Sequence, residues 1–447
     1  MAIALFNAIR KVKNMEATNS LMNFIQSATC SFTTAAAVME RLENEGFTEL
    51  NMADAWTDMK PGKYFINMHY SSVIAFTVGQ NAANNKGLAK DNLLRIAACH
   101  TDSPALYIKP NAKMSTSKYG KLNVDVYGGP ILNTWLDRPL SISGRISYKS
   151  DDVFKPNVKV LDFKDNICTI PNMAIHINRE VNKGFELNRQ TDMAPMCGLL
   201  SEELSKDDFF MKLLEEKSGV SKEDILDYEL YIYNNDEPAY VGVNKEFLSA
   251  PRIDNITSVK ACLEAITGPV REDGVNVCVF YDNEEIGSQT KQGADSTYVS
   301  MMIEKLFSAL SYSRDEFISV VTNGFYLSLD VAHGHHPNHP EKSDPTNENM
   351  LGAGIVVKRS AKQSYSTDSI AIGIIEQICK NADIKYQKYS CRSDGTTGST
   401  LGTIANKYLP MYCVDVGVPI LAMHSAREVM AVADQINLEK FVNEYLK

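Results

Sequence analysis

Four apolar stretches of the sequence are followed, directly or after a loop, by side chains that can bind a divalent metal ion. The stretches are Leu93–Cys99, Val275–Tyr281, Phe325–Leu329 and Met411–Val416. The polar residues after them are His100-Thr101-Asp102, Asp282-Asn283-Glu284-Glu285, Asp330 and His424, and Asp254 stands at the start of a predicted helix. Imidazole and carboxylate ligands without thiolates suit zinc, cobalt or manganese.

These residue types are the ones that a two-metal hydrolytic site requires. One carboxylate must bridge the two ions, and each ion needs one or two further ligands of its own. The ions polarise a carbonyl group and acidify a water molecule, and a carboxylate that binds no metal must then carry the proton to the leaving group. The adjacent Glu284 and Glu285 suit this division, because one can bind metal while the other faces the water.

Each of these residues also has an ordinary structural explanation. A histidine at a strand end is commonly hydrogen-bonded, an acidic run such as Asp282–Glu285 is commonly a solvated turn, and Asp254 could cap a helix. Their joint occurrence favours a site, because ligands of open α/β sheets bind beyond the carboxyl ends of the strands. The residues alone leave a metal-dependent hydrolase and a structural role both open.

The apolar stretches are continuous rather than alternating, which is typical of parallel strands covered by helices on both faces. The predicted helices run over Phe32–Glu45, Thr257–Ile266, Val299–Leu310, Ser369–Asn381 and from Ser425 onward. The last of these opens with Ser425-Ala426-Arg427-Glu428, which fits a capping box. This alternation of strands and helices predicts an α/β fold with a mostly parallel core sheet flanked by helices.

The middle of the chain has a different pattern. Segments such as Leu140–Ile146 and Val158–Leu161 alternate apolar and polar residues, and a helical portion is expected near Leu199–Leu214. A length of 447 residues fits two or three compact units. The predicted division is a β-rich insertion over residues 106–243 and an α/β unit formed by residues 1–105 and 244–447.

Composition narrows the classes of partner. The formal net charge of −10 argues against nucleic acid or an anionic membrane as a partner, because both require a basic face. We find no secretory signal and no apolar stretch long enough to span a bilayer, which predicts a cytoplasmic protein. The nine cysteines include no C-x-x-C pair and several lie in apolar runs, so buried thiols of a reducing compartment are expected.

Two further tracts contain polar residues that could serve a site. Residues 333–339 hold four of the eight histidines and, since they follow Asp330, are expected to line the mouth of the site. His335 and His339 are interpreted as surface residues. Residues 392–400 are rich in glycine and hydroxyl groups but lack the phosphate-loop lysine, so a turn that approaches a peptide or an anionic group is expected.

Several motifs, in one order along nearly the whole chain, resemble those of the aspartyl aminopeptidase (M18) family of zinc peptidases. The motifs are His100-Thr101-Asp102-Ser103-Pro104, Gly128-Gly129-Pro130, Trp135-Leu136-Asp137-Arg138-Pro139-Leu140, Met173-Ala174-Ile175-His176, Ala250-Pro251-Arg252-Ile253-Asp254-Asn255, Tyr281-Asp282-Asn283-Glu284-Glu285-Ile286-Gly287-Ser288, Ala422-Met423-His424-Ser425 and the stretch around Lys63-Tyr64-Phe65. One departure is Thr33, where the family often has histidine.

The resemblance implies a role for each residue of the predicted site. His100 and Asp330 would hold one divalent ion, Glu285 and His424 a second, and Asp254 would bridge them. Glu284 would be the general base, and Asp102 would orient His100. Zinc is the expected metal, with cobalt or manganese as alternatives.

The resemblance also implies an assembly and a substrate. The β-rich insertion would be the family's oligomerisation domain, which typically builds a tetrahedral dodecamer, and His176 would reach the active site of a neighbouring subunit. The substrate would be a peptide with a free N-terminus, cleaved after its first residue. His333 and His336 match substrate-binding positions, and Lys358 matches the lysine of members that prefer acidic residues, although a surface lysine is the alternative.

Three alternatives to an acid-preferring aminopeptidase stay open. The same chemistry can serve leucine or another neutral first residue. A deacylase of small amides can use the same two-metal core, and it would accept N-acetylated substrates that an aminopeptidase refuses. A peptidase-like chain can also act as a non-catalytic scaffold, although the intact Glu284 and all five predicted ligands argue against that function.

Overall fold

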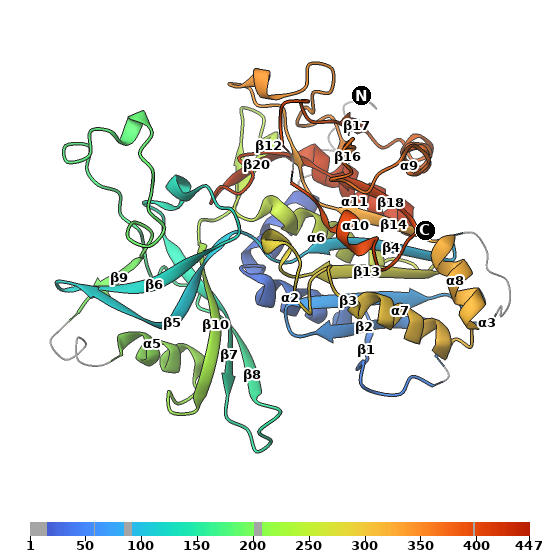
Figure 1. Cartoon of the computed structure of the whole chain (residues 1–447), viewed down its shortest axis with the longest axis horizontal. Coiled ribbons are helices and arrows are strands. Elements are labelled where there is room, and N and C mark those ends of the chain that lie inside the picture. Colours follow the sequence, from blue (N-terminus) through green and yellow to red (C-terminus); the bar gives the residue numbers. More distant parts are fainter. Residues whose placement is uncertain (1–15, 58, 85–91, 201–207, 397) are drawn as a thin grey trace, which may run out of the picture.

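The computed structural model describes residues 16–57, 59–84, 92–200, 208–396 and 398–447, and these form three β-sheets with helices around them (Figure 1). The largest sheet has nine strands. In spatial order they are β1 (Thr48–Glu49), β2 (Gly62–Met68), β3 (Ser72–Val78), β13 (Val275–Tyr281), β4 (Leu94–His100), β14 (Phe325–Leu329), β18 (Tyr412–Gly417), β16 (Ile355–Lys358) and β17 (Tyr386–Tyr389).

The four central strands of this sheet, β13, β4, β14 and β18, run parallel to one another. Almost every side chain in them is buried, as the continuous apolar sequence predicts for a sheet covered on both faces. In the register of β13 and β4, Tyr281 lies opposite His100. The polar residues that follow the two strands therefore emerge at the same edge of the sheet.

Helices cover both faces of the nine-stranded sheet (Figure 1). One apolar cluster joins the sheet to α2 (Ser31–Asn44), α6 (Ile253–Ile266), α9 (Ser369–Asn381) and α11 (Val432–Leu446). The other cluster joins the sheet to α7 (Tyr298–Ala309), α8 (Arg314–Thr322) and α10 (Leu401–Ala405). The short helix α3 (Gln80–Asn84) follows β3. Successive strand residues alternate between the two clusters, as the two-residue period of a strand requires.

The middle of the chain forms a separate antiparallel sheet with its own apolar core (Figure 1). Its six strands in spatial order are β8 (Asn157–Asp162), β7 (Leu140–Tyr148), β10 (Ile225–Asn234), β5 (Ala105–Thr116), β6 (Tyr119–Tyr127) and β9 (Met196–Leu199). Helix α5 (Phe209–Ser218) contributes Phe210 and Leu214 to this core. The assignment of residues 106–243 to an oligomerisation domain remains a prediction.

A third sheet has five strands, which come from three separate stretches of the chain. Its strands in spatial order are β11 (Ala239–Val241), β12 (Phe247–Ala250), β20 (Glu428–Ala431), β19 (Pro419–Leu421) and β15 (Ala332–His333). The short helices are η1 (Leu132–Trp135), η2 (Val181–Lys183), η3 (Glu284–Ile286) and η4 (Pro340–Lys342). No helix among the described residues is long and apolar enough to cross a membrane.

The predicted α/β fold is confirmed, and two local predictions are wrong. No helix begins at Ser425, because residues 428–431 form β20 beside β12 and α11 starts only at Val432. The helix expected near Leu199–Leu214 is α5, which runs to Ser218, while Leu199 ends β9 and residues 201–207 lie outside the described part. A helix over residues 16–27 was not predicted.

Candidate metal centre

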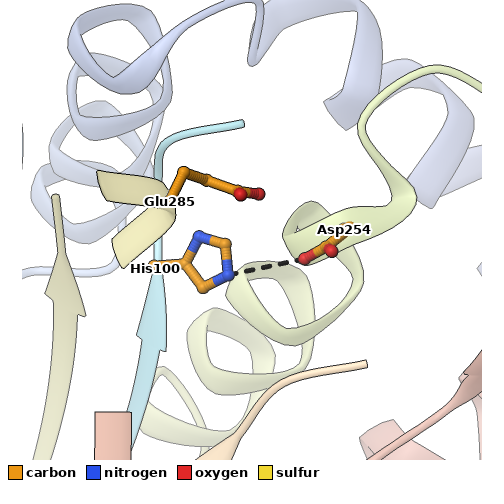
Figure 2. A group of neighbouring side chains, drawn as sticks. All are labelled: His100, Asp254 and Glu285. Atoms are coloured by element: carbon orange, nitrogen blue, oxygen red, sulfur yellow. Dashed lines mark ion pairs between the residues drawn. The ribbon is translucent and has the colours of Figure 1, made fainter. Parts of the chain in front are cut away.

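His100, Asp254 and Glu285 converge from three different elements at the carboxyl edge of the nine-stranded sheet (Figure 2). One ligand atom of each lies within 4.8 Å of the others, and Nε2 of His100 is 3.4 Å from Oδ1 of Asp254. His100 is the last residue of β4, Asp254 lies near the start of α6, and Glu285 lies in η3 after β13. The side chains of His100, Asp254 and Glu285 are 1 %, 4 % and 3 % exposed, respectively, so all three are buried.

The remaining two predicted ligands lie against this group. Nε2 of His424 is 3.3 Å from Oε2 of Glu285 and 3.5 Å from Oδ2 of Asp254. Oδ1 of Asp330 is 3.6 Å from Nε2 of His100. The two oxygens of Asp254 thus face different imidazoles, Oδ1 toward His100 and Oδ2 toward His424. The structure therefore brings all five residues together, with Asp254 in the centre.

The donor set fits divalent cations. Oδ1 of Asp254 and Oε1 of Glu285 are buried and accept no hydrogen bond. A buried carboxylate oxygen without a donor is unfavourable unless a positive charge compensates it. Imidazole and carboxylate ligands without a thiolate suit zinc and its neighbours in the first transition series. One or more such ions would be held between these five side chains.

Asp102 fixes the orientation of His100 and of the acidic turn after β13. Nδ1 of His100 lies 3.0 Å from the backbone oxygen of Asp102 and 3.3 Å from its Oδ1, which leaves Nε2 for a metal. The carboxylate of Asp102 also accepts the backbone N–H groups of Glu284 at 3.2 Å and Glu285 at 3.1 Å. Asp102 therefore holds three groups of the site in place: the His100 ring and the backbone N–H groups of Glu284 and Glu285.

His424 is oriented by a different part of the chain. Its Nδ1 lies 3.1 Å from the backbone oxygen of Gly129, so Nε2 again faces the carboxylates. His424 lies in the turn between β19 and β20 and has a left-handed backbone, with φ of 66°. The expectation that it immediately precedes a helix is wrong, since β20 follows it.

The segment that carries Asp254 is also held in an irregular conformation. Asp254 and Asn255 have non-helical backbone angles inside α6, and the peptide bond between them is cis. Arg252, with φ of 56°, donates hydrogen bonds from its buried guanidinium to the carbonyls of Ile25, Ala28 and Asn234. Asp254 does not cap the helix, because its side chain faces the two imidazoles instead.

The electrostatic environment shifts the pKa of the groups in the centre. Burial raises the pKa of Asp254, but its contacts with His100 and His424 outweigh burial and hold the pKa below its usual range. Burial lowers the pKa of His424, but Asp254 and Glu285 raise it to about 10. A crowded set of carboxylates in a low-dielectric site favours positive charge, whether protons or metal ions supply it.

Glu284 is the first residue of η3 and immediately precedes the ligand candidate Glu285. Burial and the negative charges of Asp330, Asp102 and Asp254 raise its pKa to about 8, although His100 opposes this shift. A carboxyl group whose pKa lies near neutrality can both accept and donate a proton at physiological pH. Glu284 as a residue is partly exposed, and the side chain of Glu285 is 3 % exposed.

The residues predicted to bind substrate lie in three different environments. His333 and His336 line a cavity of about 750 Å³, together with Tyr389, Arg392 and Met423. Lys358 is 1 % exposed, and its Nζ lies 3.6 Å from Oδ2 of Asp330 and donates to the backbone oxygen of Val331.

The tracts around residues 333–339 and 392–400 meet at the same cavity. His339 is exposed, as expected for a surface residue, and it also lines this cavity. His335 is half-buried and its Nδ1 lies 2.9 Å from Oγ of Ser343. Residue 397 lies outside the described part of the second tract.

The structure does not bring His176 to the centre of its own chain. It is exposed and belongs to residues 171–195, which project from the six-stranded sheet away from the nine-stranded sheet (Figure 1, green). Its proposed action in a neighbouring subunit therefore remains a prediction.

Sequence reasoning missed two side chains that support the centre. The hydroxyl of Tyr127 donates to Oδ2 of Asp102 at 2.7 Å. Glu428 is 2 % exposed and accepts the backbone N–H groups of both Asp254 and His424. No local sequence pattern around Tyr127 or Glu428 indicates that these side chains contact the ligand segments. Asp282 is buried rather than part of a solvated turn, and burial together with Asp102 raises its pKa to about 7.

Comparison with known proteins adds independent findings to this geometry. The family model described as "Aminopeptidase I zinc metalloprotease (M18)" matches residues 24–446. A protein of Clostridium acetobutylicum named "Probable M18 family aminopeptidase 2" is 40 % identical over 432 residues, which cover 96 % of this chain and 98 % of that protein.

Two solved structures show the same fold. The structure described as the Ape4 and Nbr1 complex is similar with a TM-score of 0.91 and 28 % identity, covering 97 % of this chain and 86 % of that chain. The S. cerevisiae mApe1 dodecamer is similar with a TM-score of 0.80 and 23 % identity, covering 97 % of this chain and 96 % of that chain.

Proposed function

The chain belongs to the M18 family of aminopeptidase I zinc metalloproteases, and we propose that it works by a two-metal mechanism in which Glu284 is the general base. As a member of this family it is an aminopeptidase, a hydrolase that acts on peptides. The observation that carries the proposed mechanism is the central position of Asp254, whose two carboxylate oxygens face two different histidines. A carboxylate in this position suits a bridge between two metal ions.

Each ion would have its own ligands besides Asp254. His100 and Asp330 would hold one ion, and Glu285 and His424 the other, most simply as zinc with cobalt or manganese as substitutes. When bound, two such ions supply Lewis acidity at the peptide carbonyl and lower the pKa of a water molecule. The protein's contribution is to keep both imidazoles oriented through Asp102 and Gly129 and to bury the carboxylates.

Glu284 would move the proton. Its carboxylate takes a proton from the attacking water as the water oxygen bonds to the scissile carbonyl carbon. The same group then gives that proton to the nitrogen of the leaving peptide as the carbon–nitrogen bond breaks. Glu284 directly precedes the ligand candidate Glu285 in η3 and its backbone N–H donates to Asp102, which supports its place beside the reacting water.

The substrate preference is a finer proposal. Lys358 places a cationic group beside Asp330, and its Nζ lies 5.1 Å from the centre of the Tyr365 ring. A buried cation next to a metal-ligand position supports an acidic first residue, aspartate or glutamate, because the side-chain carboxylate gains a partner there. A preference for leucine or another neutral residue is the alternative, in which Lys358 serves only to balance the charge of Asp330.

The assembly is also proposed rather than shown. The yeast relative is described as a dodecamer, and we extend a homo-oligomer of that kind to this chain. Residues 171–195 expose Met173, Ile175 and Ile177, of which Ile177 is 76 % exposed. An apolar surface of this kind supports burial against a second copy, which would carry His176 toward a neighbouring centre.

The compartment and the partners follow the same lines. All nine cysteines are free thiols, which supports a reducing compartment such as the cytoplasm. The partners proposed are peptides with a free N-terminus, and neither nucleic acid nor a membrane. A scaffold function is a weaker candidate, because the complete set of ligands and Glu284 has no use in a chain that only binds other proteins.

A panel of aminoacyl amides tests the proposal. Asp, Glu and Leu amides, each with a free and an N-acetylated amino group, should be assayed after chelation and reloading with zinc, cobalt or manganese. We expect release of the free amino acid only from the unblocked amides and only with metal, fastest for Asp or Glu. Cleavage of the acetylated amides at the same rate would identify a deacylase, and no turnover with any metal would favour the scaffold.

A further inference from the structure

Tyr127, the last residue of β6, and the two glycines after it, Gly128 and Gly129, lie against three separate groups of the metal centre. Tyr127 donates to Asp102, Gly129 accepts from His424, and Gly128 lies beside Glu285. We refer to residues 127–129 as the strap. The strap is the continuation of the six-stranded sheet, whereas the groups that it contacts follow strands of the nine-stranded and five-stranded sheets.

Tyr127 belongs to a chain of hydrogen bonds that ends at Asp102. Oγ1 of Thr290 donates to Oδ1 of Asn283 at 2.8 Å, and Nδ2 of Asn283 donates to the hydroxyl oxygen of Tyr127 at 2.9 Å. The Tyr127 hydroxyl then donates to Oδ2 of Asp102 at 2.7 Å. The Asn283 amide and the Tyr127 hydroxyl each accept from one side and donate to the other, so the direction of donation is fixed toward Asp102.

The backbone of the strap approaches the centre closely at two glycines, and at Gly128 a side chain would be disfavoured. A Cβ on Gly128 would lie 3.2 Å from the Cβ of Glu285, and the φ of Gly128 is +73°, which disfavours a side chain. A Cβ on Gly129 would lie 3.4 Å from Nδ1 of His424. Ile131, just beyond the strap, donates its N–H to the backbone oxygen of His424 at 2.9 Å. The strap is thus fastened to the turn that carries this ligand.

We propose that Tyr127 is a positioning residue of the aminopeptidase reaction, through which the six-stranded sheet sets the geometry of the metal centre. Its hydroxyl holds the Asp102 carboxylate in the one orientation that serves His100 and the amides of Glu284 and Glu285 together. The inference rests on the proposed function, because it assigns Tyr127 a role toward groups that bind metal and move the proton.

The physical reason is the number of groups that share one carboxylate. Asp102 is 3 % exposed, so water cannot readily replace a lost donor, and removal of the Tyr127 hydroxyl leaves Oδ2 with the Glu285 amide alone. The carboxylate can then turn, and both the His100 ring and the η3 backbone lose their fixed position. Loss of a partner of this kind commonly lowers metal affinity or activity by about 10- to 100-fold.

Tyr127→Phe tests the inference with little change in packing, since the ring that stacks edge-on against Tyr231 is kept. The matched control is Tyr228→Phe, which removes a hydroxyl that donates to the backbone oxygen of Lys109 at 2.9 Å in the same sheet. Zinc affinity should be measured by chelator competition, kcat and KM with the best aminoacyl amide, and unfolding temperature in the presence of chelator.

We expect Tyr127→Phe to lower zinc affinity or kcat by about tenfold or more, with KM within about twofold and an unfolding temperature like that of the control. Zinc affinity and kcat equal to those of Tyr228→Phe would overturn the inference. The inference would also be overturned if Tyr127→Phe unfolded at a temperature well below that of the control and its losses of affinity and kcat could not be separated from this destabilisation. A second substitution provides that separation.

The second substitution is Asp102→Asn, combined with Tyr127→Phe in a double-mutant cycle read by zinc affinity. If Tyr127 acts through Asp102, its substitution should have little further effect in the Asp102→Asn protein. Additive losses would overturn the inference. If the parent enzyme binds no zinc, the proposed function is overturned together with this inference. If the parent binds zinc and cleaves amides but Tyr127→Phe is unaffected, only this inference is overturned.

Discussion

The backbone N–H of His424 donates a hydrogen bond to Oε1 of Glu428 at 2.8 Å, four residues further along the chain. The other oxygen of the same carboxylate, Oε2, accepts the backbone N–H of Asp254 at 3.0 Å. In the register of the five-stranded sheet, Glu428 lies opposite Ala250, so β12 and β20 bring the two ligand segments to one acceptor. A single buried carboxylate therefore joins the proposed bridging ligand to a ligand of one ion.

Glu428→Gln is expected to weaken metal binding, because the amide would place an NH₂ group against one of the two backbone donors. The loss of one acceptor for a buried N–H commonly costs about 1–3 kcal/mol. Zinc affinity and the free energy of unfolding of the metal-free protein should both fall. Glu439→Gln, which makes the same change on α11 away from the centre, is the control, and equal zinc affinity in the two variants would contradict the assignment.

Glu284→Gln should keep the bound metal and lose most turnover. The amide is nearly the same size as the carboxylate but cannot take a proton from water, and the loss of a general base commonly lowers kcat by about 10²- to 10⁴-fold. Metal content by mass spectrometry and kcat should be measured on the same preparation. The exposed Glu49 provides a charge-matched control, Glu49→Gln. Turnover equal to that of the parent would rule out Glu284 as the base.

Asp254→Ala should lose both metal ions, since each of its carboxylate oxygens faces a different histidine. His424→Ala is the graded comparison, because it should retain the ion assigned to His100 and Asp330 and lose the other. The measurement is the number of zinc ions bound per chain after dialysis. An Asp254→Ala protein that keeps one ion would show that Asp254 does not bridge.

Zinc affinity should rise with pH between pH 6 and 8. Burial lowers the pKa of His424 in the metal-free chain, but Asp254 and Glu285 raise it to about 10, so the imidazole is protonated across this range. Zinc must displace that proton, and each displaced proton makes the affinity increase by about tenfold per pH unit until the pKa is reached. Chelator competition at three pH values gives the slope. An affinity that does not change between pH 6 and 8 would contradict this protonation state.

The proposed action of His176 in a neighbouring subunit can be tested by complementation. Homo-oligomers of His176→Ala and of Glu284→Gln should both have low activity. Mixed oligomers, formed by co-expression with two affinity tags, should regain part of it, because some centres then combine an intact Glu284 with an intact His176 from a neighbour. Activity of mixed oligomers no higher than the average of the two parents would show that His176 does not act between subunits.

The local apolar pattern of the chain was enough to predict the parallel core and the residues at its carboxyl edge. The bounds of β13, β14 and α9 agree with the predicted Val275–Tyr281, Phe325–Leu329 and Ser369–Asn381. Such elements are specified by a local apolar pattern that can be recognised in one stretch of chain. Three of the five proposed ligands, His100, Glu285 and Asp330, could be found for the same reason, since they end or follow strands whose carboxyl ends meet at one edge.

The contacts that hold those ligands could not be predicted from local patterns, because they depend on how distant segments pack together. The segment from Ser425 has the local pattern of a helix start, yet Glu428–Ala431 is a strand, because pairing with β12 outweighs a local preference. Tyr127 contacts Asp102, 25 residues away in the sequence, and Glu428 contacts Asp254 across 174 residues. Contacts of this kind follow from how separate sheets meet, and no periodicity within either segment encodes them.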